Sequence, residues 1–207
     1  MKRLFGAIAL AAALFAASSA RAQQPMGWYG TVSAGYLQLE DVGGRIGNNN
    51  VNASYDAGWS VNGALGWSFG TGLRTEVEVG YGRSSYDSVD IGGTKVNLSG
   101  DVNMWSTYLA AYYDFNIVGV RPYLGAGAGL VHFDIDNISA TANGSTFTGS
   151  GTNGTSFSAF GEAGLSFALT DRLDFVPAVR YVWINDGDSG FDDDTAWVVK
   201  AGLRYRF

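Results

Sequence analysis

The sequence predicts an all-β fold: an eight-stranded antiparallel up-and-down transmembrane β-barrel with four long extracellular loops and three short periplasmic turns. Three observations lead to this prediction. Segments of about ten residues alternate between apolar and polar side chains. The connections between these segments are alternately long and short. The last segment is apolar at every second position, which a soluble protein would leave open to pairing with other chains but which a closed barrel turns towards lipid.

The first 22 residues have the pattern of a secretory signal peptide. Two basic residues precede an apolar run, Leu4 to Ala17, and small residues follow, so we expect cleavage after Ala22. A membrane-anchoring helix is the alternative, but the run is shorter than the roughly 20 residues that span a bilayer. Residues 23–207 would then form the barrel domain, exported through the periplasm.

The composition fits one β-domain and argues against several classes of site. The chain has 30 Gly and no Cys, and charged residues make up 15% of it, against about 25% in soluble domains. Without Cys, a disulfide framework and a thiolate metal site are both excluded. The predicted mature chain keeps ten basic and 19 acidic residues, a net charge of −9, which disfavours nucleic acid as a partner. We expect no cofactor.

Eight segments are predicted to be strands. The clearest lies at 59–69, where Trp59, Val61 and Leu65 share one face and serines and asparagine share the other. Pro177 is awkward in its segment, because proline removes a donor from the hydrogen-bond ladder. In chain order the segments are 28–38, 59–69, 73–83, 102–115, 122–133, 157–169, 173–183 and about 197–207.

For some strands we predict separately which face meets the lumen and which meets lipid. In 122–133 the glycines at 125, 127 and 129 alternate with larger apolar residues, and we expect this glycine row to face a narrow lumen. The last strand must pair with the first to close the barrel. The faces of 102–115 are less distinct, and the residues expected to face lipid there are Trp105, Leu109, Tyr113 and Phe115.

The connections distinguish the two ends of the barrel. Short turns are predicted at 70–72, 116–121 and 170–172, and long loops at 39–58, 84–101, 134–156 and 184–195. In outer-membrane barrels the short turns are periplasmic and the long loops extracellular. The third loop is rich in Gly, Ser, Thr and Asn at 143–145 and 149–154, so we expect it to be mobile.

Charged side chains occupy the polar face of the strands. Four cations and four anions could not line the core of a soluble β-sandwich or a lipocalin-like barrel, the alternative folds, without a large desolvation cost. The lumen of an eight-stranded membrane barrel is just wide enough for side chains to fill. We expect these charges to pair as a plug; a narrow ion path that opens when the pairs rearrange is the alternative. The eight residues are Arg74, Glu76, Glu78, Glu162, Asp174, Arg180, Lys200 and Arg204.

Several motifs resemble a known family. They are Trp28-Tyr29-Gly30, residues 112–115, residues 121–127, and a terminal signal of Lys200, Gly202, Tyr205 and Phe207. The chain resembles small outer-membrane β-barrels of the OmpA/OmpX-like superfamily, with most likeness to the porin-like surface antigens of alphaproteobacteria. The resemblance implies a Gram-negative outer membrane, contact with its lipids and lipopolysaccharide, and recognition of the terminal signal by the β-barrel assembly machinery.

The predicted loops are acidic and polar. The expected role is a soluble, repulsive surface, without a dedicated metal site. A cation-dependent patch is the alternative, because clustered carboxylates could bind Ca²⁺ or share divalent ions with lipopolysaccharide phosphates. Their spacing does not match an EF-hand loop. The candidate residues are Asp186, Asp188, Asp192, Asp193 and Asp194.

The chain has one His, so an enzymatic role that needs an imidazole base would depend on it. His132 is expected near the outer surface, and no Ser adjoins it to make the nucleophile–base pair of a deacylase. We therefore predict a non-enzymatic outer-membrane barrel that supports envelope integrity and surface interaction, as an adhesin, an antigen or a contact for lipopolysaccharide. The alternatives are a narrow porin-like channel for ions or small solutes and, less favoured, a lipid A-modifying enzyme.

Overall fold

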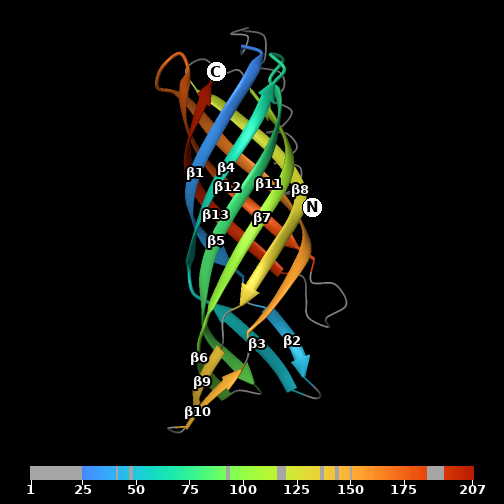
Figure 1. The fold of residues 1–207 in the computed structure, drawn as a ribbon, viewed down its shortest axis with the longest axis vertical. Coiled ribbons are helices and arrows are strands. Elements are labelled where there is room, and N and C mark those ends of the chain that lie inside the picture. Colours follow the sequence, from blue (N-terminus) through green and yellow to red (C-terminus); the bar gives the residue numbers. More distant parts are fainter. Residues whose placement is uncertain are drawn as a thin grey trace, which may run out of the picture.

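Eight long strands form the body of the molecule (Figure 1). The computed structural model describes residues 25–40, 42–46, 49–91, 94–115, 120–135, 138–142, 145–149, 151–185 and 194–207. Within these ranges, no helix is long and apolar enough to cross a membrane. The long strands are β1 (Gly27–Leu39), β4 (Gly58–Ser68), β5 (Leu73–Ile91), β7 (Asp101–Asp114), β8 (Arg121–Ile135), β11 (Thr152–Ala168), β12 (Leu173–Ile184) and β13 (Asp194–Arg206).

The eight strands close into an antiparallel barrel, as predicted. Each pairs with the next along the chain, and β13 returns to β1 in a register that runs from Tyr29 opposite Arg206 to Leu39 opposite Ala196. The ladder between β11 and β12 is interrupted beside Pro177, in keeping with the donor that proline lacks. Closure leaves no free edge in the barrel, which is the condition for a sheet to cross a bilayer.

The turns at one end are short because glycine permits them. Gly70 and Gly72 have φ of 73° and 91°, a region that L side chains rarely adopt. In the turn at 170–172, the Thr170 hydroxyl accepts a hydrogen bond from the Leu173 amide at 3.0 Å. Residues 116–119 of the third predicted turn lie outside the described residues. The short turns define the periplasmic end.

The other end of the barrel carries strands that the sequence analysis did not predict. β3 and β6 pair with β5, β2 pairs with β3, and β9 pairs with both β6 and β10, so the sheet continues past the barrel (Figure 1). The prediction of plain loops was wrong for these segments. β5 continues beyond the barrel to Ile91, and its two edges there pair with β-prone residues of the loops. These strands are β2 (Val42–Ile46), β3 (Asn49–Tyr55), β6 (Thr94–Ser99), β9 (Ile138–Ala142) and β10 (Ser145–Gly149).

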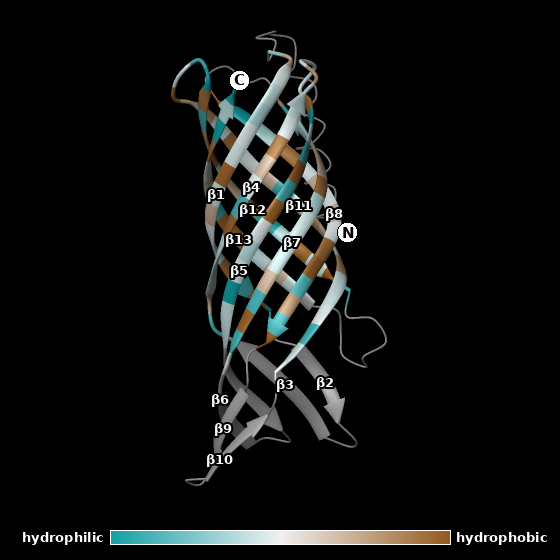
Figure 2. Ribbon diagram, in the orientation of Figure 1, coloured by the Kyte–Doolittle hydropathy of each residue, from teal (hydrophilic) through white to brown (hydrophobic). Residues whose placement is uncertain are grey.

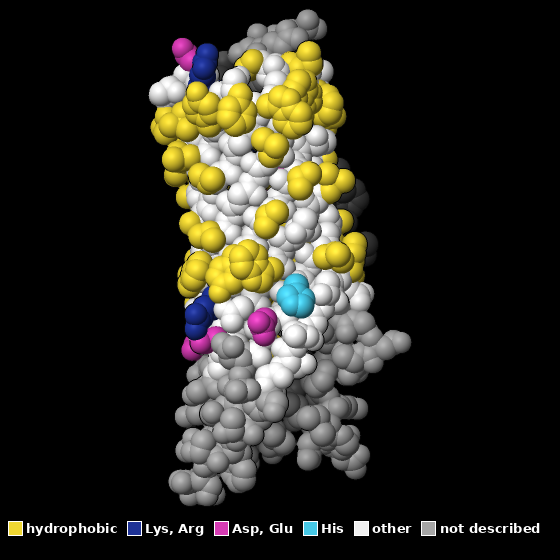
Figure 3. Space-filling model, viewed as in Figure 1, with side chains coloured by type: hydrophobic (Ala, Val, Ile, Leu, Met, Phe, Trp, Pro, Cys, Tyr) yellow, Lys and Arg dark blue, Asp and Glu magenta, His cyan; other side chains and the backbone are white. Residues whose placement is uncertain are grey.

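The outer face of the barrel is apolar. Hydrophobic and hydrophilic residues alternate along the barrel strands (Figure 2), and apolar side chains gather in bands near both ends of the barrel (Figure 3). Trp59 and Phe69 are exposed near opposite ends; ten residues at about 3.3 Å each along a strand tilted by ~40° give about 25 Å, the height of an outer-membrane apolar belt. The girdles contain ring pairs such as Trp28–Trp67 at 5.2 Å and Tyr81–Trp105 at 4.8 Å.

One predicted lipid-facing residue is buried instead. Trp105, Leu109 and Tyr113 are exposed as expected, but Phe115 is only 5% exposed. Alternation stops where β7 ends at Asp114, and the Phe115 amide then donates to the Pro122 carbonyl at 2.8 Å. Its ring packs against Tyr113 at 5.1 Å, so the turn, and not the strand period, sets its direction.

Candidate functional site

The lumen contains all eight charged residues singled out from the sequence. Each is at most 8% exposed, because strand periodicity turns these positions away from lipid. They come from four of the eight strands, so their mutual contacts depend on closure of the barrel. The eight are Arg74, Glu76, Glu78, Glu162, Asp174, Arg180, Lys200 and Arg204.

Four of them form a charge-balanced quartet across the middle of the lumen. Arg180 donates to both oxygens of Glu78, with Nη1–Oε1 at 2.5 Å and Nη2–Oε2 at 2.8 Å, and its Nε donates to Glu162 Oε2 at 2.7 Å. Lys200 Nζ lies 2.8 Å from Glu162 Oε2 and 3.6 Å from Glu78 Oε2. Two cations therefore share two carboxylates, the fork geometry that suits arginine.

Aromatic side chains complete the quartet. The Tyr123 hydroxyl donates to Glu162 Oε1 at 3.0 Å. The Arg180 guanidinium carbon lies 3.7 Å from the centre of the Phe160 ring, close enough for a cation–π interaction. Every described partner of the two carboxylates is thus a cation or a hydroxyl donor, which offsets the cost of burying them.

A second cluster lies closer to the periplasmic turns. Arg74 pairs with Glu76, and its Nε donates to Asp114 Oδ2 at 3.0 Å. The Tyr29 hydroxyl also donates to Glu76, at 2.9 Å. The Arg74 guanidinium carbon lies 4.1 Å from the centre of the Tyr112 ring. This cluster joins β1, β5 and β7; β5 also supplies Glu78 of the quartet, and β1 pairs with β13, which supplies Lys200.

Asp174 and Arg204 differ from the expected pairing. Asp174 is held by Arg121 at 2.7 Å and by Arg206 at 2.5 Å, and not by the cations predicted for the network. Arg204 stands opposite Asp174 in the β12–β13 register, yet among the described residues it has no ion-pair partner. Its guanidinium carbon lies 5.5 Å from the Tyr29 ring centre and 5.6 Å from that of Tyr123.

Sequence reasoning missed several members of these clusters. Asp114 shares its strand face with Tyr108 and Tyr112, so alternation in β7 could have identified it. Arg206 shares its strand face with Lys200 and Arg204, so alternation in β13 could have identified it. Arg121 is the first residue of β8, where periodicity gives no signal.

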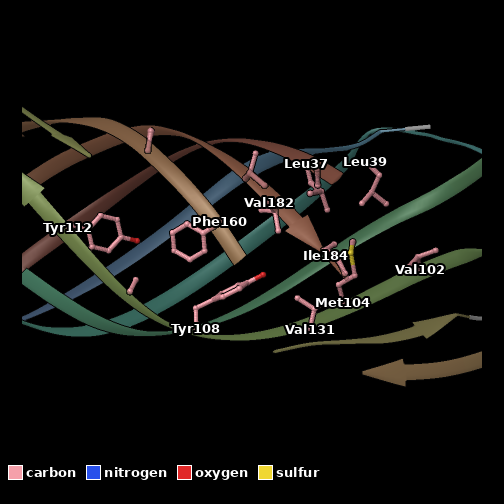
Figure 4. Close-up of a cluster of buried hydrophobic side chains, with 14 of the residues drawn as sticks. Leu37, Leu39, Val102, Met104, Tyr108, Tyr112, Val131, Phe160, Val182 and Ile184 are labelled. Atoms are coloured by element: carbon pink, nitrogen blue, oxygen red, sulfur yellow. The ribbon is translucent and has the colours of Figure 1, made fainter. Parts of the chain in front are cut away.

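The extracellular part of the lumen is apolar, which was not predicted. Inward side chains from six barrel strands pack against one another there (Figure 4). A cavity of about 70 Å³ separates this apolar layer from Arg180 and Lys200. At these levels the inner face is apolar and the outer face is mixed, with polar Gln38 and Asn103 but apolar Trp183, so alternation of polarity could not mark the inner face. The layer includes Leu37, Leu39, Val102, Met104, Val131, Val182 and Ile184.

The residues of the predicted assembly signal have separate surroundings. Lys200 belongs to the quartet, and a Cβ on Gly202 would lie 2.6 Å from the Val32 carbonyl oxygen. Tyr205 and Phe207 are exposed on the outer face, with ring centres 5.6 Å apart.

The candidate calcium ligands fall mostly on residues that the structure does not describe. Asp186, Asp188, Asp192 and Asp193 lie outside the described residues, as does the side chain of Asp194.

His132 lies on the outer surface, on the extracellular side of the lower apolar band in Figure 3. Its Nδ1 is 2.9 Å from the Thr155 hydroxyl oxygen. In the described part of the chain, no carboxylate hydrogen-bonds the ring. A hydroxyl and an imidazole without a third group to orient the base form an incomplete nucleophile–base system.

Comparisons with known proteins agree with this architecture. Residues 7–207 match the family model described as the outer membrane protein beta-barrel domain. An outer membrane protein of Gluconacetobacter diazotrophicus is 31% identical over 150 residues, which cover 64% of this chain but only 39% of that protein.

Two solved structures share the fold. Neisserial surface protein A is 25% identical with a TM-score of 0.58, covering 87% of this chain and 97% of that one. OprG of Pseudomonas aeruginosa is 18% identical with a TM-score of 0.57, covering 89% and 98%; at that identity the likeness concerns the fold alone. The closed barrel, its apolar belt and the family match over nearly the whole sequence lead to one conclusion: this chain belongs to the outer membrane protein β-barrel domain family of Gram-negative outer-membrane proteins.

Proposed function

We propose that this protein is a non-enzymatic structural component of the outer membrane with a closed lumen. The observation that supports this most is the filling of the lumen in layers: an apolar layer, a neutral quartet and a periplasmic cluster. Three cavities lined by described lumen side chains have volumes of about 70, 10 and 50 Å³, each enough for at most about seven waters. A barrel filled in this way supports the envelope and presents loops, whose sequences are acidic.

A deletion strain tests the envelope role. We expect greater sensitivity to detergent and more membrane blebbing than in the parent strain, because the cell loses a barrel that contacts outer-membrane lipid and lipopolysaccharide. Complementation with the unchanged gene should restore both properties. An envelope indistinguishable from that of the parent would count against the structural role and favour a purely surface-interacting one.

The terminal signal is proposed to address the chain to the β-barrel assembly machinery. Phe207 is 73% exposed, so its ring contributes little to packing and remains available to a partner. We expect Phe207→Ala to reduce the amount of folded protein in the outer-membrane fraction, measured by heat-modifiable mobility in gels. Leu169→Ala, at another exposed apolar position near the periplasmic turns, is the control. Equal losses from both variants would contradict a specific signal.

The non-enzymatic assignment has its own test at His132. Under the proposal, His132→Ala and Thr155→Ala strains keep the lipid A profile of the parent in mass spectra, because the pair lacks an orienting third group. The loss of one lipid A species from both variants would instead assign a lipid A-modifying activity to this pair.

A further inference from the structure

We infer that the periplasmic mouth of the barrel binds a small oxyanion, a phosphate or a carboxylate, between Arg204, Arg74, Arg206 and Ser68. A cavity of about 50 Å³ lies there, lined by these four residues together with Trp28 and Phe207, among others. A water needs about 10–15 Å³ measured in this way, so the cavity admits one small oxyanion or the terminal group of a larger one. This inference goes beyond the proposed envelope role and does not depend on it.

The first line of support is a set of hydrogen-bonding atoms without partners in the protein. They are Arg204 Nε, Arg74 Nη2, Arg206 Nε and Ser68 Oγ, one from each of the four residues. Arg74, Arg204 and Ser68 are 2%, 5% and 6% exposed. Buried donors are almost always satisfied in proteins, and leaving one unmet costs about 1–3 kcal/mol. Four such atoms around one cavity indicate a shared acceptor.

The second line of support is excess positive charge. In the periplasmic half of the lumen, four arginine side chains face three side-chain carboxylates, whereas the quartet above is neutral. The unmatched cation is Arg204, whose described contacts are two tyrosine rings. Arginine cannot lose its proton, so this charge persists at every physiological pH. The residues counted are Arg74, Arg121, Arg204 and Arg206 against Glu76, Asp114 and Asp174.

Charge and donors together favour an oxyanion over water alone. Water would accept hydrogen bonds from the guanidinium groups, but it would leave the buried charge uncompensated. A phosphate or carboxylate supplies both charge and two acceptor oxygens, which the planar guanidinium of arginine can bind in a bidentate manner. The site also crosses the closing seam, because Arg204 and Arg206 lie on β13, Ser68 on β4 and Arg74 on β5. Bound anion should therefore stabilise the closed barrel.

Calorimetry on the refolded barrel in a non-ionic detergent tests the inference. Inorganic phosphate and acetate are titrated separately in an oxyanion-free buffer of constant ionic strength. We expect saturable binding of at least one of them, and the one that binds identifies phosphate or carboxylate as the preferred class. Arg204→Gln should weaken binding by about tenfold or more, and Ser68→Ala by about fivefold. Arg83→Gln, at the extracellular end beside Asp101, is the matched control and should bind as the unchanged protein does.

Two further readouts keep the result independent of folding defects. The urea midpoint of the unchanged barrel and of Arg83→Gln should rise with the binding anion, whereas that of Arg204→Gln should not. Crystals grown with selenate should show an anomalous peak beside the Arg204 guanidinium, with selenate oxygens within hydrogen-bond distance of it. The inference is overturned if neither anion binds saturably, or if folded Arg204→Gln and Ser68→Ala barrels both bind as the unchanged protein does.

Discussion

Replacing Arg180 with Gln is expected to lower the free energy of unfolding by about 3–5 kcal/mol, because it leaves two buried carboxylates with one cation between them. Arg180 is the only residue of the quartet that forms close hydrogen bonds with both Glu78 and Glu162 in the described structure. Its side chain is 4% exposed, so solvent does little to screen the charges that remain. Reversible urea unfolding in detergent micelles, followed by tryptophan fluorescence, measures the difference.

Two variants separate this effect from a general loss of arginine. Arg83→Gln breaks an ion pair with Asp101 whose side chains are 45% and 33% exposed, and it should cost about 0–1 kcal/mol. Adding Glu78→Gln to Arg180→Gln leaves one lysine facing one carboxylate at 2.8 Å, so the double variant should be more stable than Arg180→Gln alone. If the second substitution destabilises further, the quartet is not an electrostatic unit.

The second large effect is expected at the glycine row that faces the lumen. A Cβ on Gly129 would lie 1.9 Å from the Thr107 carbonyl oxygen, which is backbone of the neighbouring strand and cannot rotate away. Gly129→Ala must therefore displace β7 from β8, at an expected cost of about 1–3 kcal/mol or more. The same unfolding measurement, or the temperature at which the folded band disappears from gels, reports it.

Gly63→Ala is the matched control for the glycine prediction. Gly63 also lies within a barrel strand, but it faces outward and a Cβ there would meet nothing within 4 Å. Its free energy of unfolding should change by about 0.5 kcal/mol or less. Equal stability of the two variants would show that the β7 backbone gives way at Gly129 more easily than this contact implies.

Most of the barrel, and part of the packing in its lumen, could be predicted from the sequence. Alternation located all eight barrel strands because lipid and lumen impose opposite polarities on neighbouring residues, as Trp59 and Ser60 illustrate. It also placed the quartet inside. It could not show which charges would meet, since partners such as Glu78 and Arg180 are 102 residues apart and their contact depends on barrel register.

The remaining differences between prediction and structure arise where the alternation of apolar and polar residues is weak or interrupted. The apolar layer around Leu37 and Ile184 was missed because the inner face there is apolar and the outer face is mixed, so no polar row marks the lumen. Phe115 was misplaced because the turn after Asp114 breaks the period. The extracellular strands were missed because they lie beyond the lipid, where nothing enforces alternation. The alternation of apolar and polar residues therefore predicts side-chain direction only where one face of a strand meets lipid and the other meets a polar lumen.

Planar-bilayer recording of the purified barrel tests the closed lumen most directly. The layered filling by the apolar residues, the quartet and the periplasmic cluster predicts no steady conductance, with at most rare and brief openings. Arg180→Gln, if it remains folded, should open more often than the unchanged barrel because it weakens the middle layer. A steady, large conductance from the unchanged, fully folded protein would contradict the account and assign a porin-like channel in its place.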